Sequence, residues 1–206
     1  MTVIDVDNWN RRDHFRFFRE FAEPFFGLTL RVDCGVAHAR AKQRGESFFL
    51  RYLHHILGAV NDVECFRYRI RGDQVVLLDT IHASATINRE DGTFDFSYIP
   101  FAAEFGEFAV GAQREIDRIR TSTGLNPGVA EDDVIHFSAV PWLDFTGLSH
   151  ARQYRYPDSC PKISVGKMTE RGGELGMPLS LHAHHALMDG RDVAEFADRL
   201  RERMNG

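Results

Sequence analysis

The sequence predicts one compact α/β domain. The chain has 206 residues, of which 43% are hydrophobic, and a chain of this length can bury a substantial core within the usual size of a single domain. Helical and strand patterns are mixed along it, without an internal repeat or a low-complexity linker. Several predicted strands follow one another closely, so they pair antiparallel, and a doubly wound parallel sheet is disfavoured.

The first predicted feature is an aromatic stretch near the amino terminus. Trp9, Phe15, Phe17, Phe18 and Phe21 are interleaved with arginines, which is a dense set of rings for a surface helix. We therefore expect these rings to be buried in the core.

The later elements follow from periodicity and turn residues. FFLRYLHHILGAVND has apolar residues at helical spacing, and Ser47 before it is a suitable helix cap, so a half-buried helix is expected. The strands expected next cover 66–70, 75–78 and 82–87, as a hairpin or meander with a turn at 71–73. The remaining expected elements are a helix over 103–120, a turn at 125–128, strands over 134–140, 163–168 and 177–183, and a helix over 191–203.

Composition narrows the class of partner. The net charge is −5 and no run of lysine and arginine exceeds a pair, which argues against a nucleic-acid surface or a polybasic membrane patch. No membrane span or signal peptide is evident, so a cytoplasmic location is expected. Cys34, Cys65 and Cys160 are odd in number and far apart, so neither a disulfide framework nor a zinc site is expected. A small-molecule partner fits best.

The most informative motif is HHALMDG at residues 184–190. It follows the alternating run 179–183, at the point where a predicted strand gives way to a helix. A strand end holds a side chain rigidly, and a positioned imidazole can take a proton from an alcohol or thiol. His185 is therefore the candidate general base.

The sequence around the histidines is also compatible with packing, metal-binding and capping roles. A histidine at a strand end is often only a packed residue. His182 and His184 share a strand face and, with Asp189, form a partial metal-ligand set, although no third ligand at metal spacing is evident. Asp189 is also a suitable helix cap. The pair His54-His55 lies inside the amphipathic helix without a following Asp-Gly, so a packing or surface role is expected there.

Five further segments accompany HHALMDG in order along the chain. They are WNRRDHF at 9–15, FRYRI at 66–70, TF at 93–94, SAVPW at 138–142 and MPL at 177–179. HHALMDG matches the HHxxxDG signature of coenzyme A-dependent acyltransferases. Together with the ordered segments, it makes the chain resemble the chloramphenicol acetyltransferase family over nearly its full length.

The resemblance implies a fold, an assembly and a reaction. It implies a two-layer α/β sandwich over residues 1–206, with a mixed, mostly antiparallel sheet covered by helices, assembled as a homotrimer with active sites between subunits. His185 would accept the proton of an acceptor hydroxyl that attacks the thioester of acetyl-CoA, and no metal is required. Asp189 and Arg11 would form an ion pair behind the histidine, whose loss would cost roughly 3–5 kcal/mol if it is buried. Lys167 would lie on the coenzyme side.

The chain departs from the family pattern at the residue expected to stabilise the oxyanion. Where the family carries a serine after its Pro-Trp segment, this sequence has Gly147. Loss of such a donor costs about 10²–10³ in turnover unless Thr146, Ser149 or a backbone amide substitutes. Ser164 falls at a second hydroxyl position of the family. Phe18 stands where some members place a tyrosine against the substrate, and Arg191-Asp192 replaces the usual Phe-His after the glycine.

Two functions from different classes follow. The first is acetyl-CoA-dependent O-acetylation of chloramphenicol or a similar small alcohol, which the HHxxxDG histidine favours. The second is a relative of low or no activity that binds a small ligand or forms a trimeric scaffold, which Gly147 favours. Turnover with any acceptor distinguishes them.

Overall fold

The computed structural model describes residues 1–126, 132–153 and 157–206 and has an α/β fold, as predicted. Its helices are α1 (Arg12–Phe18), α2 (Gly35–Arg44), α3 (Phe48–Asp62), α4 (Phe105–Thr121) and α5 (Gly190–Asn205), with 3-10 turns η1 (Val6–Asn8) and η2 (Glu64–Arg67). Its strands are β1 (Thr2–Val3), β2 (Phe25–Asp33), β3 (Tyr68–Arg71), β4 (Gln74–Leu77), β5 (His82–Asn88), β6 (Phe94–Phe96), β7 (Val134–Ala139), β8 (Lys162–Val165), β9 (Thr169–Arg171) and β10 (Glu174–His184).

The strands form a large mixed sheet and a small one. The large sheet has the order β2-β10-β8-β7-β5-β6, with β9 paired to β10, and the small sheet has the order β1-β4-β3. In the large sheet, β7 is parallel to both β5 and β8, and the other pairs are antiparallel. The predicted mixed, mostly antiparallel sheet is therefore confirmed.

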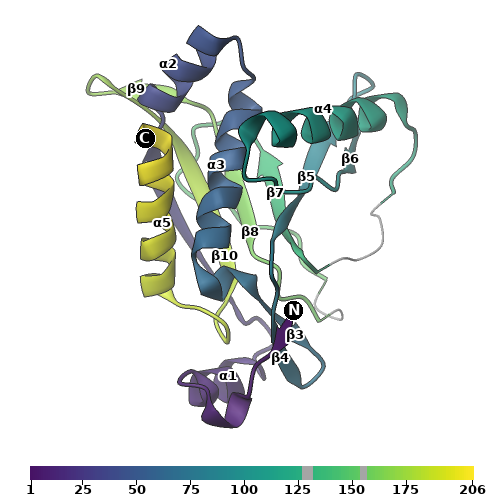
Figure 1. Ribbon diagram of the computed structural model, residues 1–206, viewed down its shortest axis with the longest axis vertical. Helices are drawn as coiled ribbons and strands as arrows, with labels where there is room; N and C mark the ends of the chain where they lie inside the picture. The colour runs from purple at the N-terminus through teal and green to yellow at the C-terminus, as the bar shows by residue number, and fades with distance from the viewer. Residues whose placement is uncertain (127–131, 154–156) are drawn as a thin grey trace.

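One face of the large sheet is covered by helices. Helices α3 and α5 run side by side in front of the sheet, while α4 lies over the side of the sheet formed by β5, β6 and β7 (Figure 1). Leu179 and Leu181 of β10 pack in one core cluster with Leu53 of α3 and Phe196 of α5, because alternate residues of a strand point to the same face. This gives the two layers. Among the described residues, no helix has the length and apolar content needed to cross a bilayer.

Helix α3 forms as predicted. The Ser47 hydroxyl accepts a hydrogen bond from the Leu50 amide at 3.4 Å, which caps the first turn. His54 in this helix is buried, and its Nε2 lies 3.0 and 3.1 Å from the carbonyl oxygens of Ala102 and Ala103. The first residue of the His54-His55 pair therefore has the expected packing role.

The second face of the large sheet carries two rows of polar side chains that run across the strands. In the first, which we call the basic row, strand register places Ser84, His136, Lys162, His182 and Gly27 side by side. Gly27 ends the row because β2 is the edge strand, and a Cβ at this position would lie 2.5 Å from Nε2 of His182. No other residue type fits at Gly27 unless the imidazole moves.

The second row, which we call the hydroxyl row, runs parallel to the first. It consists of Ser138, Ser164, Ser180 and Thr29 in register. Ser164 and Ser180 are completely buried. A sheet face with buried hydroxyl and basic groups is unsuited to packing against a helix, so this face is available for a binding function.

Several elements differ from the sequence-based expectation. Strand β2 and helix α2 were not predicted, because Gly27 interrupts the strand pattern and the N-cap of α2, Cys34, offers no capping hydrogen bond from its side chain. The strand expected at 66–70 begins only at Tyr68, after η2, and the one expected at 163–168 ends at Val165. Strand β5 joins the large sheet instead of extending the β3-β4 hairpin into a meander. Of the turn expected at 125–128, residues 127–128 lie outside the described residues.

The three cysteines are free and buried. Burial raises the pKa of the Cys34 thiol to about 11, so this thiol is protonated at neutral pH. These residues act as small core side chains, in agreement with the sequence.

The FRYRI segment ties the small sheet to the large one through Arg69, which is fully buried. Its guanidinium donates to the carbonyl oxygens of Phe66, Tyr68 and Val134 at 2.8, 2.7 and 2.8 Å, and also to that of Asp132. The planar fork of arginine suits such convergent acceptors, whereas a lysine ammonium is a single point. Arg69 therefore fixes the start of β7 against β3.

We expect Arg69→Lys to lower the free energy of unfolding by about 1–3 kcal/mol or more, because buried carbonyl groups lose their donors. Chemical denaturation measures the change. Arg67→Lys is the matched control, since Arg67 makes a single such bond, to the Leu78 carbonyl. Equal stability of the two variants would contradict this role for Arg69.

Candidate active site

The HHALMDG segment lies where β10 ends and α5 begins. His184 is the last residue of β10, and residues 185–189 form a turn before α5. The His185 amide donates to the Pro24 carbonyl at 2.8 Å, which anchors the turn to the segment before β2. The turn after β10 thus fixes the backbone of His185 against the segment before β2.

The hydrogen bonding of His185 defines its tautomer. Its Nδ1 lies 3.2 Å from the Met188 carbonyl oxygen. Because a carbonyl oxygen can only accept, Nδ1 carries the proton and the lone pair is on Nε2. In its neutral form His185 therefore presents Nε2 as the ring nitrogen with a lone pair, which is what a general base requires.

Two phenylalanines cover the imidazole of His185. The Phe18 ring stacks on it at 4.0 Å between centroids and 15° between planes, and the Phe26 ring lies at 4.7 Å. The expected burial of the amino-terminal aromatic stretch is wrong in part: Phe15 is buried, but Phe17 and Phe21 are 62% and 44% exposed. The short α1 buries only one side, so Phe17, Phe18 and Phe21 instead form an aromatic cluster beside His185.

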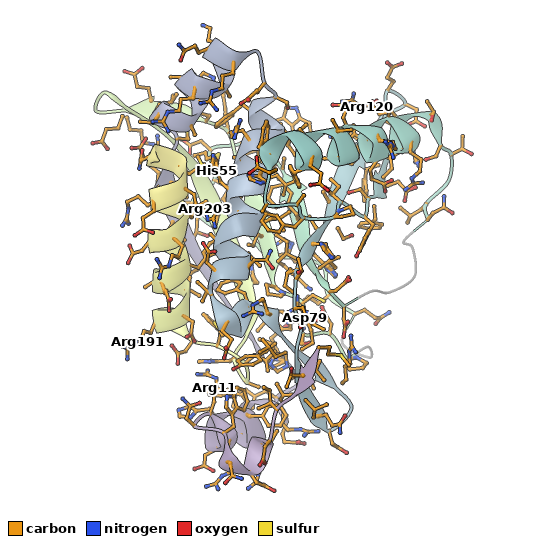
Figure 2. All side chains as sticks on the ribbon, viewed as in Figure 1. Arg11, His55, Asp79, Arg120, Arg191 and Arg203 are labelled. Carbon is orange, nitrogen blue, oxygen red and sulfur yellow. The ribbon has the colours of Figure 1, made fainter. Side chains whose placement is uncertain are left out.

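Arg11 ties the turn together from the other end of the chain. Its guanidinium donates to the carbonyl oxygens of His185 at 2.8 Å and Ala186 at 3.2 Å, and to Oδ2 of Asp189 at 3.0 Å. Figure 2 shows Arg11 just below the start of α5, where Arg191 is labelled. The hydrogen bond from Arg11 holds the pKa of the Asp189 carboxyl below its usual range.

Asp189 also caps α5. Its Oδ1 accepts from the Arg191 amide at 2.9 Å, while Asp192 accepts from the Asp189 amide at 2.7 Å, so the two acids form a capping box. The side chains of Arg11 and Asp189 are 14% and 41% exposed. Loss of this ion pair therefore costs less than the roughly 3–5 kcal/mol of a fully buried pair, because the carboxylate remains partly solvated.

The side chain of His184 lies in a different environment from that of His185. Its Nδ1 accepts from the Ala186 amide at 3.2 Å, and its ring meets Phe25 edge-on at 5.3 Å. Burial lowers the pKa of His184 to about 4, so it is neutral near pH 7. The two adjacent histidines therefore have different environments, and only His185 has Nε2 as a free base.

The expected oxyanion residues lie around a cavity on the helix-free face. A cavity of about 560 Å³ is lined by Gly147, Ser149, His150, His182 and Thr29, among others. A Cβ on Gly147 would meet no atom within 4 Å, and its φ is not positive. Thr146 is exposed beside it, whereas Ser164 is completely buried and hydrogen-bonded to Ser138. Ser164 therefore lies next to this region but under its surface.

Lys167 lies on the turn after β8, next to the Pro-Trp segment. Its side chain is exposed, and its amide donates to the Leu143 carbonyl at 2.7 Å. For the partial metal set, no group of three or more His, Cys, Asp or Glu is placed to hold an ion within the described ranges.

A larger cavity of about 840 Å³ adjoins the first one. It is bounded by Ser84 and Thr86 of β5, Phe94 and Phe96 of β6, and Ser138 of β7. Both cavities share the side chains of His150 and Lys162 as walls. His185 lines neither of them, so within one chain the candidate base does not border the cavities lined by Ser138 and Gly147.

The basic row has little signal in the sequence. Lys162 is buried, yet its ammonium pairs with Asp158 at 2.6 Å and lies 3.4 Å from Nδ1 of His136. The one available signal was a lysine next to the strand expected over 163–168, since a lysine is seldom buried without a partner.

Known proteins of similar sequence match nearly the whole chain. The sequence model of the family described as chloramphenicol acetyltransferase matches residues 1–201. Chloramphenicol acetyltransferase 3 of Escherichia coli is 30% identical over 206 residues, which cover 99% of this chain and 97% of that protein. Chloramphenicol acetyltransferase of Campylobacter coli is 27% identical over 208 residues, with 99% and 98% covered.

Solved structures give the same result. A structure titled chloramphenicol acetyltransferase superposes with a TM-score of 0.91 and 36% identity, covering 98% of this chain and 99% of that one. Dihydrolipoamide acetyltransferase of Azotobacter vinelandii has a TM-score of 0.68 at 17% identity, covering 94% and 86%, and is similar in fold alone. This chain therefore belongs to the chloramphenicol acetyltransferase family and is an acyltransferase.

Proposed function

We propose that residues 1–206 act as one acetyl-CoA-dependent O-acetyltransferase domain with His185 as general base. The observation that carries this proposal is the bond between Nδ1 of His185 and the Met188 carbonyl, which leaves the Nε2 lone pair free. Nε2 accepts the proton of the acceptor hydroxyl while that oxygen attacks the thioester carbonyl carbon of acetyl-CoA. As the carbon–sulfur bond breaks, the imidazolium returns the proton to the coenzyme A sulfur.

Arg11 and Asp189 support the base without taking part in proton transfer. Arg11 fixes the backbone carbonyls of His185 and Ala186, and Asp189 joins that arginine to the first turn of α5. Phe18 and Phe26 limit rotation of the imidazole by packing on its faces. A positioned imidazole needs no further reorganisation when the substrates arrive.

The acceptor we propose is chloramphenicol or a similar small alcohol. The names of the relatives support it, and the cavity of about 840 Å³ suits a ligand of that size. Its lining combines the rings of Phe94 and Phe96 with the hydroxyl groups of Ser84, Thr86 and Ser138, which suits a ligand with both a ring and hydroxyl groups. The exposed Lys167 lies on the side proposed for coenzyme A.

We further propose a homotrimer in which each active site lies between two subunits. His185 and the cavity with Ser138 lie apart in one chain, although the reaction requires the base within about 3 Å of the acceptor hydroxyl. A neighbouring copy can supply the missing half of each site. Closed symmetry then completes all sites equally.

Gly147 supports the alternative of a relative with low or no activity. Glycine offers no side-chain donor to the oxyanion, and the nearby Ser164 hydroxyl is engaged with Ser138. The exposed Thr146 and Ser149 hydroxyls and the Gly147 amide are the remaining candidates. Release of free thiol from acetyl-CoA, measured across a panel of alcohols including chloramphenicol, separates the two proposals, because a binding protein or scaffold gives none.

We expect His185→Gln to lower kcat by about 10²–10⁴-fold, the usual contribution of a general base. The protein should still fold, because His185 is only partly buried at the protein edge. Steady-state kinetics with a coupled thiol assay measure the effect. His184→Gln is the matched control and should retain most turnover; a large loss there with activity kept in His185→Gln would reverse the assignment.

We expect Gly147→Ser to raise turnover about tenfold, equivalent to about 1.4 kcal/mol of transition-state stabilisation. The substitution introduces no backbone strain, because Gly147 has no positive φ, and its new Cβ has open space. Gly147→Ala is the control, since it adds the Cβ without the hydroxyl. If both variants change turnover equally, the hydroxyl does not act on the oxyanion.

The shared site can be tested by complementation. We expect His185→Gln to lack the base and Ser84→Trp to have a blocked cavity, so each should be inactive alone. Co-refolding the two should restore activity, because a mixed trimer contains interfaces with an intact base on one side and an open cavity on the other. A mixture that remains inactive, while size measurements show mixed trimers, would place both halves of the site in one chain.

A further inference from the structure

A buried lysine organises the basic row beneath the larger cavity. The Lys162 side chain is only 6% exposed, and its ammonium lies 2.6 Å from Oδ2 of Asp158, 3.3 Å from the Cys160 carbonyl oxygen and 3.4 Å from Nδ1 of His136. An ammonium has three donors and no lone pair. These three neighbours match its three donors.

This arrangement determines the tautomer of His136. The Lys162 ammonium donates to Asp158 and has no lone pair, so Nδ1 of His136 can only accept from it, and the ring proton of the neutral imidazole is on Nε2. The protein packed around the ring and the charge of Lys162 lower the pKa of His136 to about 4, so the ring is neutral near pH 7. His136 therefore has one available N–H, which is the opposite of the arrangement in His185.

The available N–H borders open space. Although protein packs around part of the ring, His136 keeps an exposed surface, which lines both the cavity of about 840 Å³ and a neighbouring hollow on the side of Asp132. Its Nε2 has no hydrogen-bond partner among residues 1–126, 132–153 and 157–206. On the adjacent strand, Ser84 lies directly beside it in register. A donor without a protein partner on the wall of a cavity is suited to binding a ligand oxygen.

We propose that His136 is a specificity-determining residue of the acceptor cavity, where its Nε2–H donates a hydrogen bond to a nitro, carbonyl or carboxylate oxygen of the acceptor. Lys162 and Asp158 act as positioning residues that hold the imidazole in the donor tautomer. The positive charge of Lys162 behind the ring strengthens the donor toward oxygens that bear negative charge. This inference rests on the proposed function, since it selects among alcohols that the enzyme acetylates.

Three matched probes test the selection: 4-nitrobenzyl alcohol, 4-(hydroxymethyl)benzoate and 4-methylbenzyl alcohol. They share the reacting hydroxyl and the ring, and they differ in whether the para group accepts a hydrogen bond. We expect kcat/KM to be at least tenfold higher for the nitro and carboxylate probes than for the methyl probe, mainly through KM. In His136→Phe this ratio should fall to about one, and in His136→Gln, which keeps an N–H donor, it should be partly retained.

His55→Phe is the control for general effects of replacing a histidine, because His55 lies on α3, on the helix-covered side (Figure 2). It should leave the ratio of kcat/KM values as in the wild type. A wild-type ratio near one, or a ratio that survives in His136→Phe, would overturn the proposal.

Nitrogen-15 NMR of labelled imidazoles gives a readout that needs no turnover. We expect His136 to be protonated at Nε2 at neutral pH, its Nε2 resonance to move on addition of the nitro or carboxylate probe but not the methyl probe, and the tautomer preference to weaken in Lys162→Met. If no probe is acetylated but the resonance moves in this way, the proposed function fails and the binding role of His136 stands. Protonation at Nδ1, or no response to any probe, would overturn the role of His136 whatever the turnover.

Discussion

The structure of the candidate site depends on the three hydrogen bonds of Arg11 to the turn between β10 and α5. The arginine fixes two backbone carbonyls and one carboxylate that are separated from it by about the whole length of the chain. The turn therefore cannot relax without breaking several bonds at once. The same turn supplies the Met188 carbonyl that orients His185, so a backbone contact of the turn sets the tautomer of the candidate base. Asp189 then extends this support into the cap of α5.

The two faces of the large sheet have different roles. A helix-covered face provides the core, while the opposite face holds the basic and hydroxyl rows beneath two adjoining cavities. Buried polar groups of this kind cost stability unless they are paired, as Lys162 is with Asp158 and Ser164 is with Ser138. In our proposal this face receives the acceptor, and His185 of a neighbouring subunit reaches it from the edge.

The sequence predicted the fold class and much of the local structure for identifiable reasons. Helix α3 and the capped start of α5 have strong periodicity and polar caps, and both were predicted at nearly the right bounds. Strand β2 and helix α2 lack those signals and were missed. The motif residues His185, Arg11 and Asp189 could be named from the sequence because a family resemblance assigns them. His136 and Lys162 could not, because their importance arises from register between strands and from contact with Asp158, and neither is visible in linear spacing.

The most direct test of the account is a crystal structure of the protein with coenzyme A and an acceptor that it acetylates. We predict that the reacting hydroxyl oxygen lies about 2.6–3.2 Å from Nε2 of His185 in one subunit, while the rest of the acceptor occupies the cavity beside Ser84 and Phe94 of the next subunit. An acceptor bound with its hydroxyl against another base, or held entirely within one chain, would contradict the account.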